Sequence, residues 1–189
     1  MNKAVFLDRD GTLIEEVNYL KKKEEISIYP ETIKALRNFK KSGYLNIIIT
    51  NQSGIARGYF SEDDLDAVHI ELRKMLTADG QELIEDIYYS PFHIDGIIEK
   101  FTKESNYRKP ATGMIERAKT EHDLDLSSSF FIGDSYTDML CAENAGIKKI
   151  LVRTGYGERD YKKCIDNKII PDFFAGNIYE ASLYILNSN

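Results

Sequence analysis

Two aspartates near the N-terminus, Asp8 and Asp10, stand where an apolar segment ends abruptly. Residues 3–8 read Lys-Ala-Val-Phe-Leu-Asp, which is typical of a buried strand of a parallel sheet, and Gly11 follows the pair. At the carboxyl end of such a strand, one carboxylate can attack an electrophile while the other transfers a proton, and both can bind a divalent cation. The same residues also suit a tight turn, so the pair alone leaves a turn and a catalytic site equally open.

Three further segments place polar residues at expected strand ends or helix starts. An apolar run over residues 47–51 ends in the small hydroxyl residue Thr50 and an asparagine. Residues 108–110 read Arg-Lys-Pro, and a proline suits the first turn of a helix. Residues 130–134 read Phe-Phe-Ile-Gly-Asp, with Asp138 four residues further on. The order of these segments, and not any one of them, favours a catalytic site.

These four segments resemble the signatures of the haloacid dehalogenase superfamily of phosphatases, and they span most of the chain. The resemblance implies that Asp8 is the nucleophile, which forms an aspartyl-phosphate, and that Asp10 is first the general acid and then the general base. It also implies that Thr50 and the backbone of Asn51 hydrogen-bond the phosphoryl oxygens. Lys109 is expected to neutralise charge on the phosphate and on Asp8, as a compact point charge can.

The same resemblance implies a bound Mg²⁺. Asp8 and Asp134 are expected to supply carboxylate oxygens to the ion and Asp10 its backbone carbonyl, because hard cations prefer oxygen ligands. Asp138 is left with two readings of equal weight. It is either a residue that supports the metal ligands or an acid favoured in the first turn of a helix.

Residues 50–58, Thr-Asn-Gln-Ser-Gly-Ile-Ala-Arg-Gly, are the most specific segment. Together with the first and third segments they resemble the D-glycero-D-manno-heptose 1,7-bisphosphate phosphatases, whose near relatives are the histidinol-phosphate phosphatases. The resemblance implies a small phosphorylated sugar as substrate, with Arg57 and Arg108 as contacts for a second anionic group. Histidinol phosphate or another small phosphomonoester is the alternative substrate. A non-catalytic phosphate-binding relative is a third possibility, which the complete set of catalytic residue types disfavours.

One segment departs from these relatives, which usually carry a structural zinc before Arg-Lys-Pro. The positions of their Cys-x-His and Cys-x-Cys ligands are here Ser90, Phe92, Ser105 and Tyr107. Because His93 is displaced by one position and no cysteine lies near it, a tetrahedral zinc site is not expected. We expect the loop over residues 91–107 to be held instead by packing and hydrogen bonds, through Phe92 and Tyr107.

Three other residues are expected to have structural roles. Arg9 lies between the two N-terminal aspartates and can form a salt bridge there. His69 and His122 fall in segments with helical periodicity, where a structural or exposed position is expected rather than a catalytic one.

Alternating strand and helix patterns predict an α/β fold, a doubly wound parallel sheet of the haloacid dehalogenase type. The expected strands are 3–8, 44–50, 86–90, 129–133 and 148–153. The expected helices are 31–42, the stripe of Leu65 to Leu76 capped by Ser61, 112–122, 137–145 and 178–187. No insertion is long enough for a large cap domain, so 1–189 is read as a single domain. Its irregular loops, 12–27 and 91–107, are expected to border an open active site.

Composition excludes several other classes of function. The chain has 189 residues, of which 42% are hydrophobic and 30% charged, with a net charge of −6. The absence of a basic stripe argues against a nucleic-acid partner, and no apolar stretch suits a membrane span or a secretory signal. The two cysteines, Cys141 and Cys164, suggest free thiols in a reducing cytoplasm. A monomer is the default expectation.

Overall fold

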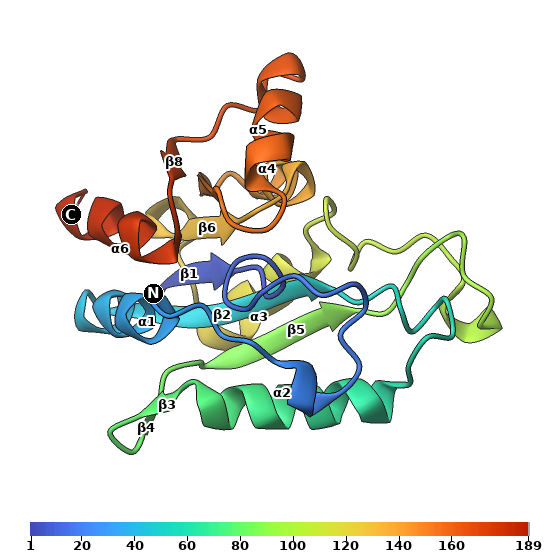
Figure 1. The fold of residues 1–189 in the computed structure, drawn as a ribbon. Coiled ribbons are helices and arrows are strands. Elements are labelled where there is room, and N and C mark those ends of the chain that lie inside the picture. The colour runs from blue at the N-terminus through green and yellow to red at the C-terminus, as the bar shows by residue number, and fades with distance from the viewer. Residues whose placement is uncertain (189) are drawn as a thin grey trace.

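The computed structural model describes residues 1–188 and is built around a six-stranded parallel sheet (Figure 1). The strands of this sheet are β1 (Lys3–Leu7), β2 (Tyr44–Asn51), β5 (Asp86–Ser90), β6 (Phe130–Gly133), β7 (Lys148–Val152) and β8 (Phe173–Ala175). They lie side by side in the order β5-β2-β1-β6-β7-β8, and every adjacent pair is parallel. The chain therefore winds outward from β1 in one direction and from β6 in the other. This confirms the doubly wound α/β fold, and it puts a topological switch point between β1 and β6.

Helices cover both faces of the sheet. They are α1 (Thr32–Lys41), α2 (Glu62–Met75), α3 (Gly113–His122), α4 (Tyr136–Ala145), α5 (Gly157–Asp166) and α6 (Ile178–Asn187). Most buried apolar side chains of α1, α2 and α6 share one core, and most of those of α3 and α4 share the other. α5 packs against α4 and β7. Three short 3-10 helices, Lys23–Glu25, Glu99–Phe101 and Leu126–Ser128, lie in the connections.

Strand β1 contributes to both cores because its side chains alternate between the two faces of the sheet. Val5 and Leu7 pack with α1, α2 and α6, whereas Ala4 and Phe6 pack with α3 and α4. All four side chains are fully buried. A strand covered on both faces needs apolar residues at every position, which explains the uninterrupted apolar run in the sequence.

The predicted elements are confirmed with shifts of one or two residues at their ends. Helix α5, strand β8 and a small hairpin formed by β3 (Thr77–Ala78) and β4 (Gln81–Glu82) were not predicted. α5 buries only Gly157, Asp160 and Cys164, so no series of large buried apolar residues marks it in the sequence.

The first irregular segment, 12–27, lies against the body of the molecule, whereas 91–107 is largely exposed. In segment 12–27, Leu13 and Ile14 are fully buried, and an isolated bridge joins Ile14 to Ile28. Among residues 1–188, no connection carries a folded unit larger than the β3–β4 hairpin. No helix in this part of the chain is both long and apolar enough to cross a membrane.

Candidate active site

The candidate site lies where strands β1, β2 and β6 end side by side. Asp8 follows β1 directly, Thr50 is the penultimate residue of β2, and Asp134 follows β6. The backbone N–H of Asp8 donates to the carbonyl of Ile132, 2.9 Å away, so the register of β1 with β6 continues to the catalytic position. Neighbouring parallel strands thus bring residues from three distant parts of the sequence to one edge of the sheet.

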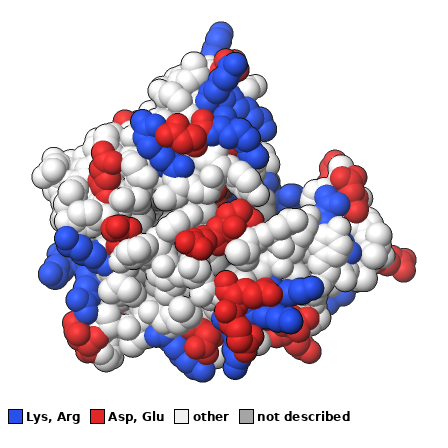
Figure 2. Space-filling view, in the orientation of Figure 1, with Lys and Arg blue, Asp and Glu red and all other residues white. Residues whose placement is uncertain are grey.

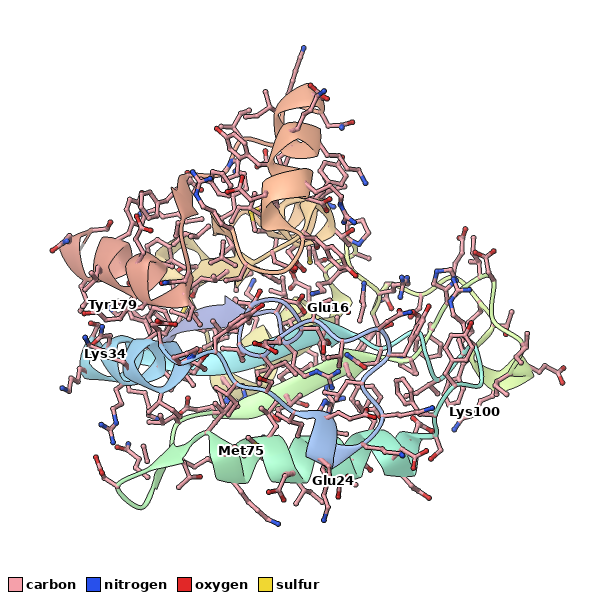
Figure 3. All side chains as sticks on the ribbon, in the orientation of Figure 1. Glu16, Glu24, Lys34, Met75, Lys100 and Tyr179 are labelled. Atoms are coloured by element: carbon pink, nitrogen blue, oxygen red, sulfur yellow. The ribbon has the colours of Figure 1, made fainter. Side chains whose placement is uncertain are left out.

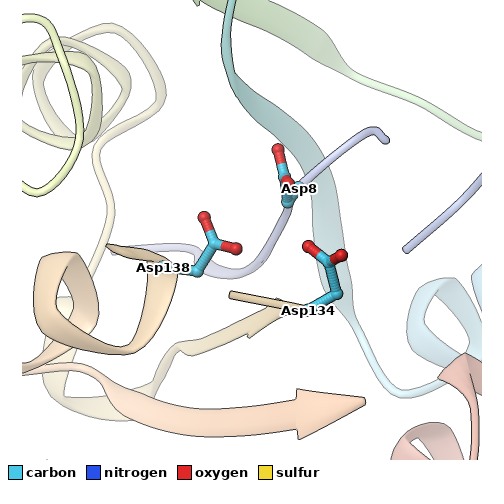
Figure 4. Close-up of side chains that lie close together, drawn as sticks. All are labelled: Asp8, Asp134 and Asp138. Carbon is cyan, nitrogen blue, oxygen red and sulfur yellow. The ribbon is translucent and has the colours of Figure 1, made fainter. Parts of the chain in front are cut away.

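Three carboxylates face one another at this edge (Figure 4). Asp8, Asp134 and Asp138 each offer an oxygen, and these oxygens all lie within 4.8 Å of one another. Among residues 1–188 this is the one group of at least three His, Cys, Asp or Glu side chains close enough to share a metal ion. Asp134 and Asp138 are buried, whereas the side chain of Asp8 is 13% exposed.

Lys109 is the cation opposite these carboxylates, as the sequence predicted. Its Nζ donates to Asp8 Oδ1 at 2.8 Å, to Asp138 Oδ1 at 2.5 Å and to the carbonyl of Ile49 at 2.9 Å. The ammonium group has three N–H donors, so all of them are used. The residue is only 4% exposed, which fixes the ammonium beside the nucleophile candidate.

The pKa values of these groups reflect burial and mutual charge. Burial, reinforced by Asp138, raises the pKa of Asp8 to about 7, although Lys109 opposes the shift. Burial and the charges of Asp8 and Asp138 raise the pKa of Asp134 to about 9. Burial alone would lower the pKa of Lys109, but Asp138 and Asp8 together raise it. Clustered carboxylates that resist ionisation are stabilised by a divalent cation, so this all-oxygen donor set fits Mg²⁺.

Asp138 is the acid in the first turn of a helix that one of the two readings expected, whereas its support of metal ligands stays a prediction. It is the third residue of α4, where its Oδ2 accepts from the backbone N–H of Ser135 at 3.1 Å. Ser135 in turn caps the helix by accepting from the backbone N–H of Asp138, which completes a capping box. The other carboxylate oxygen accepts from Lys109. A single side chain therefore fixes the start of α4 and holds the ammonium of Lys109.

Asp134 is held by a loop that follows β7. The backbone N–H of Tyr156 donates to Asp134 Oδ2 at 2.7 Å. Two glycines make room for this carboxylate, because a Cβ would come within 2.2 Å of its Oδ2 at Gly11 and within 2.0 Å at Gly155. Both glycines also have positive φ angles, +76° and +57°. Close approach and backbone conformation both require glycine here.

Asp10 points to different partners. Arg9 forms two hydrogen bonds with its carboxylate, and Gln52 Nε2 donates to Asp10 Oδ2 at 3.0 Å and to Thr50 Oγ1 at 2.8 Å. The expected salt bridge of Arg9 is confirmed. The carboxylate of Asp10 is not part of the three-carboxylate cluster.

The three predicted substrate-binding residues, Asn51, Arg57 and Arg108, differ in their positions relative to the cavity. The side chain of Asn51 donates to the carbonyl of Lys109 and accepts from its backbone N–H, at 3.1 and 3.0 Å, so it fixes the loop that carries the lysine. Arg108 lines the cavity described below. Arg57 does not line that cavity but contacts His93 at 3.2 Å. Burial, reinforced by the positive charge of Arg57, lowers the pKa of Arg108.

The loop over residues 91–107 is held by packing and hydrogen bonds. Phe92 packs on Phe101 with ring centroids 6.0 Å apart, and Tyr107 packs against the core formed with α3 and α4. Arg108 Nη1 donates to the carbonyl of Phe92 at 3.2 Å. These contacts confirm the expected roles of Phe92 and Tyr107. The absence of zinc stays a prediction.

A cavity of about 510 Å³ opens over these groups. Its walls include Asp8, Asp10, Lys109, Asp134 and residues 16–20 of the first irregular loop. In Figure 2 acidic side chains lie at the centre of the face that Figure 1 presents, and Figure 3 labels Glu16 there, above the central strands. Burial and the nearby Asp10 charge raise the pKa of Glu16 to about 7. A volume of this size suits a small metabolite.

Sequence reasoning missed several residues of this site. Gln52 lies within the segment that carried the resemblance, yet no role was assigned to it. Glu16 and Tyr156 lie in loops without periodicity, so only their three-dimensional neighbours reveal them. The turn that precedes Tyr156, Thr154-Gly155, is the one local signal that could have marked the second of these loops.

Comparisons with known proteins agree with this architecture. Residues 106–181 match the family model described as HAD-hydrolase-like. The D-glycero-D-manno-heptose-1,7-bisphosphate 7-phosphatase of Thermosynechococcus vestitus is 37% identical over 185 residues, which cover 96% of this chain and 94% of that protein. The D-glycero-alpha-D-manno-heptose-1,7-bisphosphate 7-phosphatase of Photorhabdus laumondii is 41% identical, with 82% and 84% of the two chains covered.

The solved structures include a similar enzyme with ligands bound. The D,D-heptose 1,7-bisphosphate phosphatase of B. bronchiseptica, complexed with magnesium and phosphate, superimposes with a TM-score of 0.84 at 26% identity, and 99% of each chain is covered. The identity, the coverage and the fold show that this chain has an α/β fold of the haloacid dehalogenase type and belongs to the D-glycero-D-manno-heptose-1,7-bisphosphate 7-phosphatase family.

Proposed function

We propose that this chain removes the 7-phosphate of D-glycero-D-manno-heptose 1,7-bisphosphate by way of an aspartyl-phosphate on Asp8. One observation carries the proposal. The Asp8 carboxylate borders a metabolite-sized cavity, 2.8 Å from the buried ammonium of Lys109 and beside two further carboxylates. Phosphoryl transfer requires a positioned nucleophile together with positive charge beside it, and this arrangement supplies the nucleophile and the lysine.

The reaction has two halves in this proposal. An Asp8 oxygen attacks phosphorus while the bond from phosphorus to the sugar oxygen breaks, and Asp10 gives its proton to that oxygen. Water then attacks the same phosphorus and gives a proton to Asp10, and the bond to Asp8 breaks to release inorganic phosphate. Thr50 and the backbone of Asn51 hold the phosphoryl oxygens, and Lys109 offsets their charge.

Mg²⁺ is the proposed cofactor, held by Asp8, Asp134 and the backbone carbonyl of Asp10. When bound, it supplies positive charge that reduces repulsion between the Asp8 carboxylate and the phosphate. Asp138 contributes by keeping Lys109 in place, with its Oδ1 2.5 Å from the ammonium. The magnesium and phosphate in the B. bronchiseptica structure support this assignment.

The choice of substrate rests on the relatives and on Arg108, which lines the cavity and can meet the 1-phosphate, with Arg57 behind it. Relatives named for the alpha and the beta anomer are about equally similar, 41% and 40% identical in Photorhabdus laumondii and Haemophilus ducreyi. The anomer is therefore a question for assay. A single domain over 1–189, a monomer, a cytoplasmic location and the absence of a nucleic-acid partner stay predictions.

An Asp8→Asn variant tests the mechanism, because an amide cannot accept the phosphoryl group. Activity is expected to fall to background, whereas Asp66→Asn, on the exposed face of α2, serves as the matched control and retains full activity. Wild-type kcat/KM is measured with both anomers of the heptose bisphosphate, histidinol phosphate and fructose bisphosphate. Full activity in Asp8→Asn refutes the mechanism, and a higher kcat/KM with histidinol phosphate refutes the substrate.

A further inference from the structure

We propose that His69, acting through Arg9, is a positioning residue for proton transfer by Asp10. The inference rests on the proposed function, because it assigns a supporting structure to the general acid. His69 belongs to α2, a helix that supplies none of the residues that were predicted to be catalytic. The proposal therefore extends the active site into a layer beneath the cavity.

Arg9 is the link between the helix and the carboxylate. The Arg9 side chain is large and only 1% exposed. Its guanidinium donates two parallel hydrogen bonds to Asp10, from Nε to Oδ2 at 3.1 Å and from Nη2 to Oδ1 at 3.0 Å. A bidentate pair of this kind sets the plane of the carboxylate as well as its position. The orientation of Asp10 thus follows the orientation of the Arg9 guanidinium.

His69 fixes that guanidinium from the other side. Its Nε2 lies 3.1 Å from Arg9 Nη1, which has only donors, so the ring nitrogen must accept. This requires a neutral imidazole with its proton on Nδ1. The environment enforces that state, because burial, together with Arg9 and Arg73, lowers the pKa of His69 to about 3. The ring also packs edge-on against Tyr89, with centroids 5.9 Å apart.

Gln52 completes the support by donating to the Oδ2 of Asp10. Without the acceptor on His69, one N–H of a buried guanidinium has no partner, and the guanidinium is free to turn toward another acceptor. Any such turn moves the Asp10 carboxylate away from the leaving oxygen. General acid catalysis depends on hydrogen-bond geometry at that oxygen, so the loss should appear in proton transfer.

The experiment compares a substrate that needs a proton on its leaving group with one that does not. A sugar alkoxide leaves poorly unless it is protonated, whereas the phenolate of p-nitrophenyl phosphate leaves without help. The value of kcat/KM covers the steps up to transfer onto Asp8, so it isolates the acid role of Asp10 from its later role as a base. A purely structural residue would affect both substrates alike.

The variants are His69→Leu, which removes the acceptor, and His69→Gln, whose amide oxygen restores one. His69→Leu is expected to lower kcat/KM about tenfold or more for the best sugar phosphate and less than about twofold for p-nitrophenyl phosphate. His69→Gln recovers most of the lost rate. Ile70→Leu, at a position 57% exposed on the same helix, is the matched control and changes neither value.

Equal losses with both substrates, or no loss with either, overturn the proposal. If His69→Leu does not fold, Arg9→Lys provides the same comparison, because lysine keeps the charge but lacks the planar fork, and it must show the same difference between substrates. Failure of the proposed function looks different. It appears as an inactive wild type or an active Asp8→Asn variant, whatever the histidine variants do.

Discussion

Replacing Lys109 with methionine separates the structural role of its ammonium from its role in catalysis. The ammonium pairs with two carboxylates at 2.8 and 2.5 Å, and the lysine and Asp138 side chains are only 3% and 1% exposed. Removing one partner of a buried ion pair leaves charge without compensation and costs about 3–5 kcal/mol of unfolding free energy. Lys109→Met is therefore expected to lose about that much stability at neutral pH and to lose its phosphatase activity.

The double variant Lys109→Met/Asp138→Asn is the decisive comparison. It removes the lysine and the more deeply buried of its two carboxylate partners, while asparagine keeps an acceptor for the N-terminus of α4. Stability, measured by urea unfolding without added metal, is expected to recover part of the loss, because buried pairs replaced together cost far less than a single deletion. Activity is expected to stay at background, because the charge beside Asp8 is still missing.

Two results would refute this reasoning about Lys109. A loss of less than about 1 kcal/mol in Lys109→Met would mean that the carboxylates are compensated by other groups. Substantial phosphatase activity in either variant would mean that the ammonium is not needed for phosphoryl transfer.

Two further predictions each compare a pair of proteins, first two glycine variants and then a His69 variant with the wild type. Gly155→Ala should destabilise the fold and reduce activity, because the new Cβ would lie 2.0 Å from Asp134 Oδ2. Gly146 has a similar φ of +68°, but a Cβ there would have nothing within 4 Å. Gly146→Ala should therefore cost only about 1–2 kcal/mol of stability and leave kcat unchanged. Equal effects of the two alanines on kcat would contradict the steric argument. In the folded protein His69 has a pKa of about 3, which is below the ordinary value of 6.5 that it has in the unfolded chain. Protonation therefore favours the unfolded state. The stability that neutral His69 contributes is lost as the pH falls through and below 6.5. From pH 7 to 5 this loss is about 2 kcal/mol, and denaturant titration of His69→Gln should show a drop smaller by that amount.

The sequence predicted the parts of this fold that repeat a simple physical pattern. Strand β1 is buried on both faces and therefore reads as uninterrupted apolar residues, which end where Asp8 begins. Ser61 and the acids that follow it mark the start of α2, and the structure has a capping box there. In contrast, α5 buries only Gly157, Asp160 and Cys164, so its sequence lacks the large apolar residues at helical spacing by which the other helices were predicted.

The candidate site was predictable to the extent that strand ends define it. Residues such as Asp8, Thr50 and Asp134 come together because parallel neighbours in a sheet end at the same edge. The directions in which side chains point could not be predicted in the same way. The sequence suggested that Arg9 pairs with the aspartates beside it, but it does not indicate that Gln52 binds Asp10 or that Asp138 holds the lysine, because these contacts depend on tertiary packing.

The charge around the cavity explains why a cation and a phosphate should bind together. Five carboxylates line it, Asp8, Asp10, Glu16, Asp134 and Asp138, against three cations, Arg9, Arg108 and Lys109. At a pH of about 9 or above, where Asp134 also ionises, the cavity thus carries an excess of up to two negative charges, which opposes a phosphate dianion. A divalent cation balances this excess.

Inorganic phosphate is therefore expected to bind wild-type protein at least about tenfold more tightly with saturating Mg²⁺ than with EDTA, a coupling of about 1.4 kcal/mol. Calorimetric titration of phosphate at pH 9, near the pKa of Asp134, measures this difference directly under the two conditions. Glu16→Gln is the informative variant, because it removes one negative charge without touching the carboxylate cluster and should narrow the difference. Equal phosphate affinity with and without Mg²⁺ would show that the lysine and arginines already balance the carboxylates, and that the excess charge has no consequence for binding.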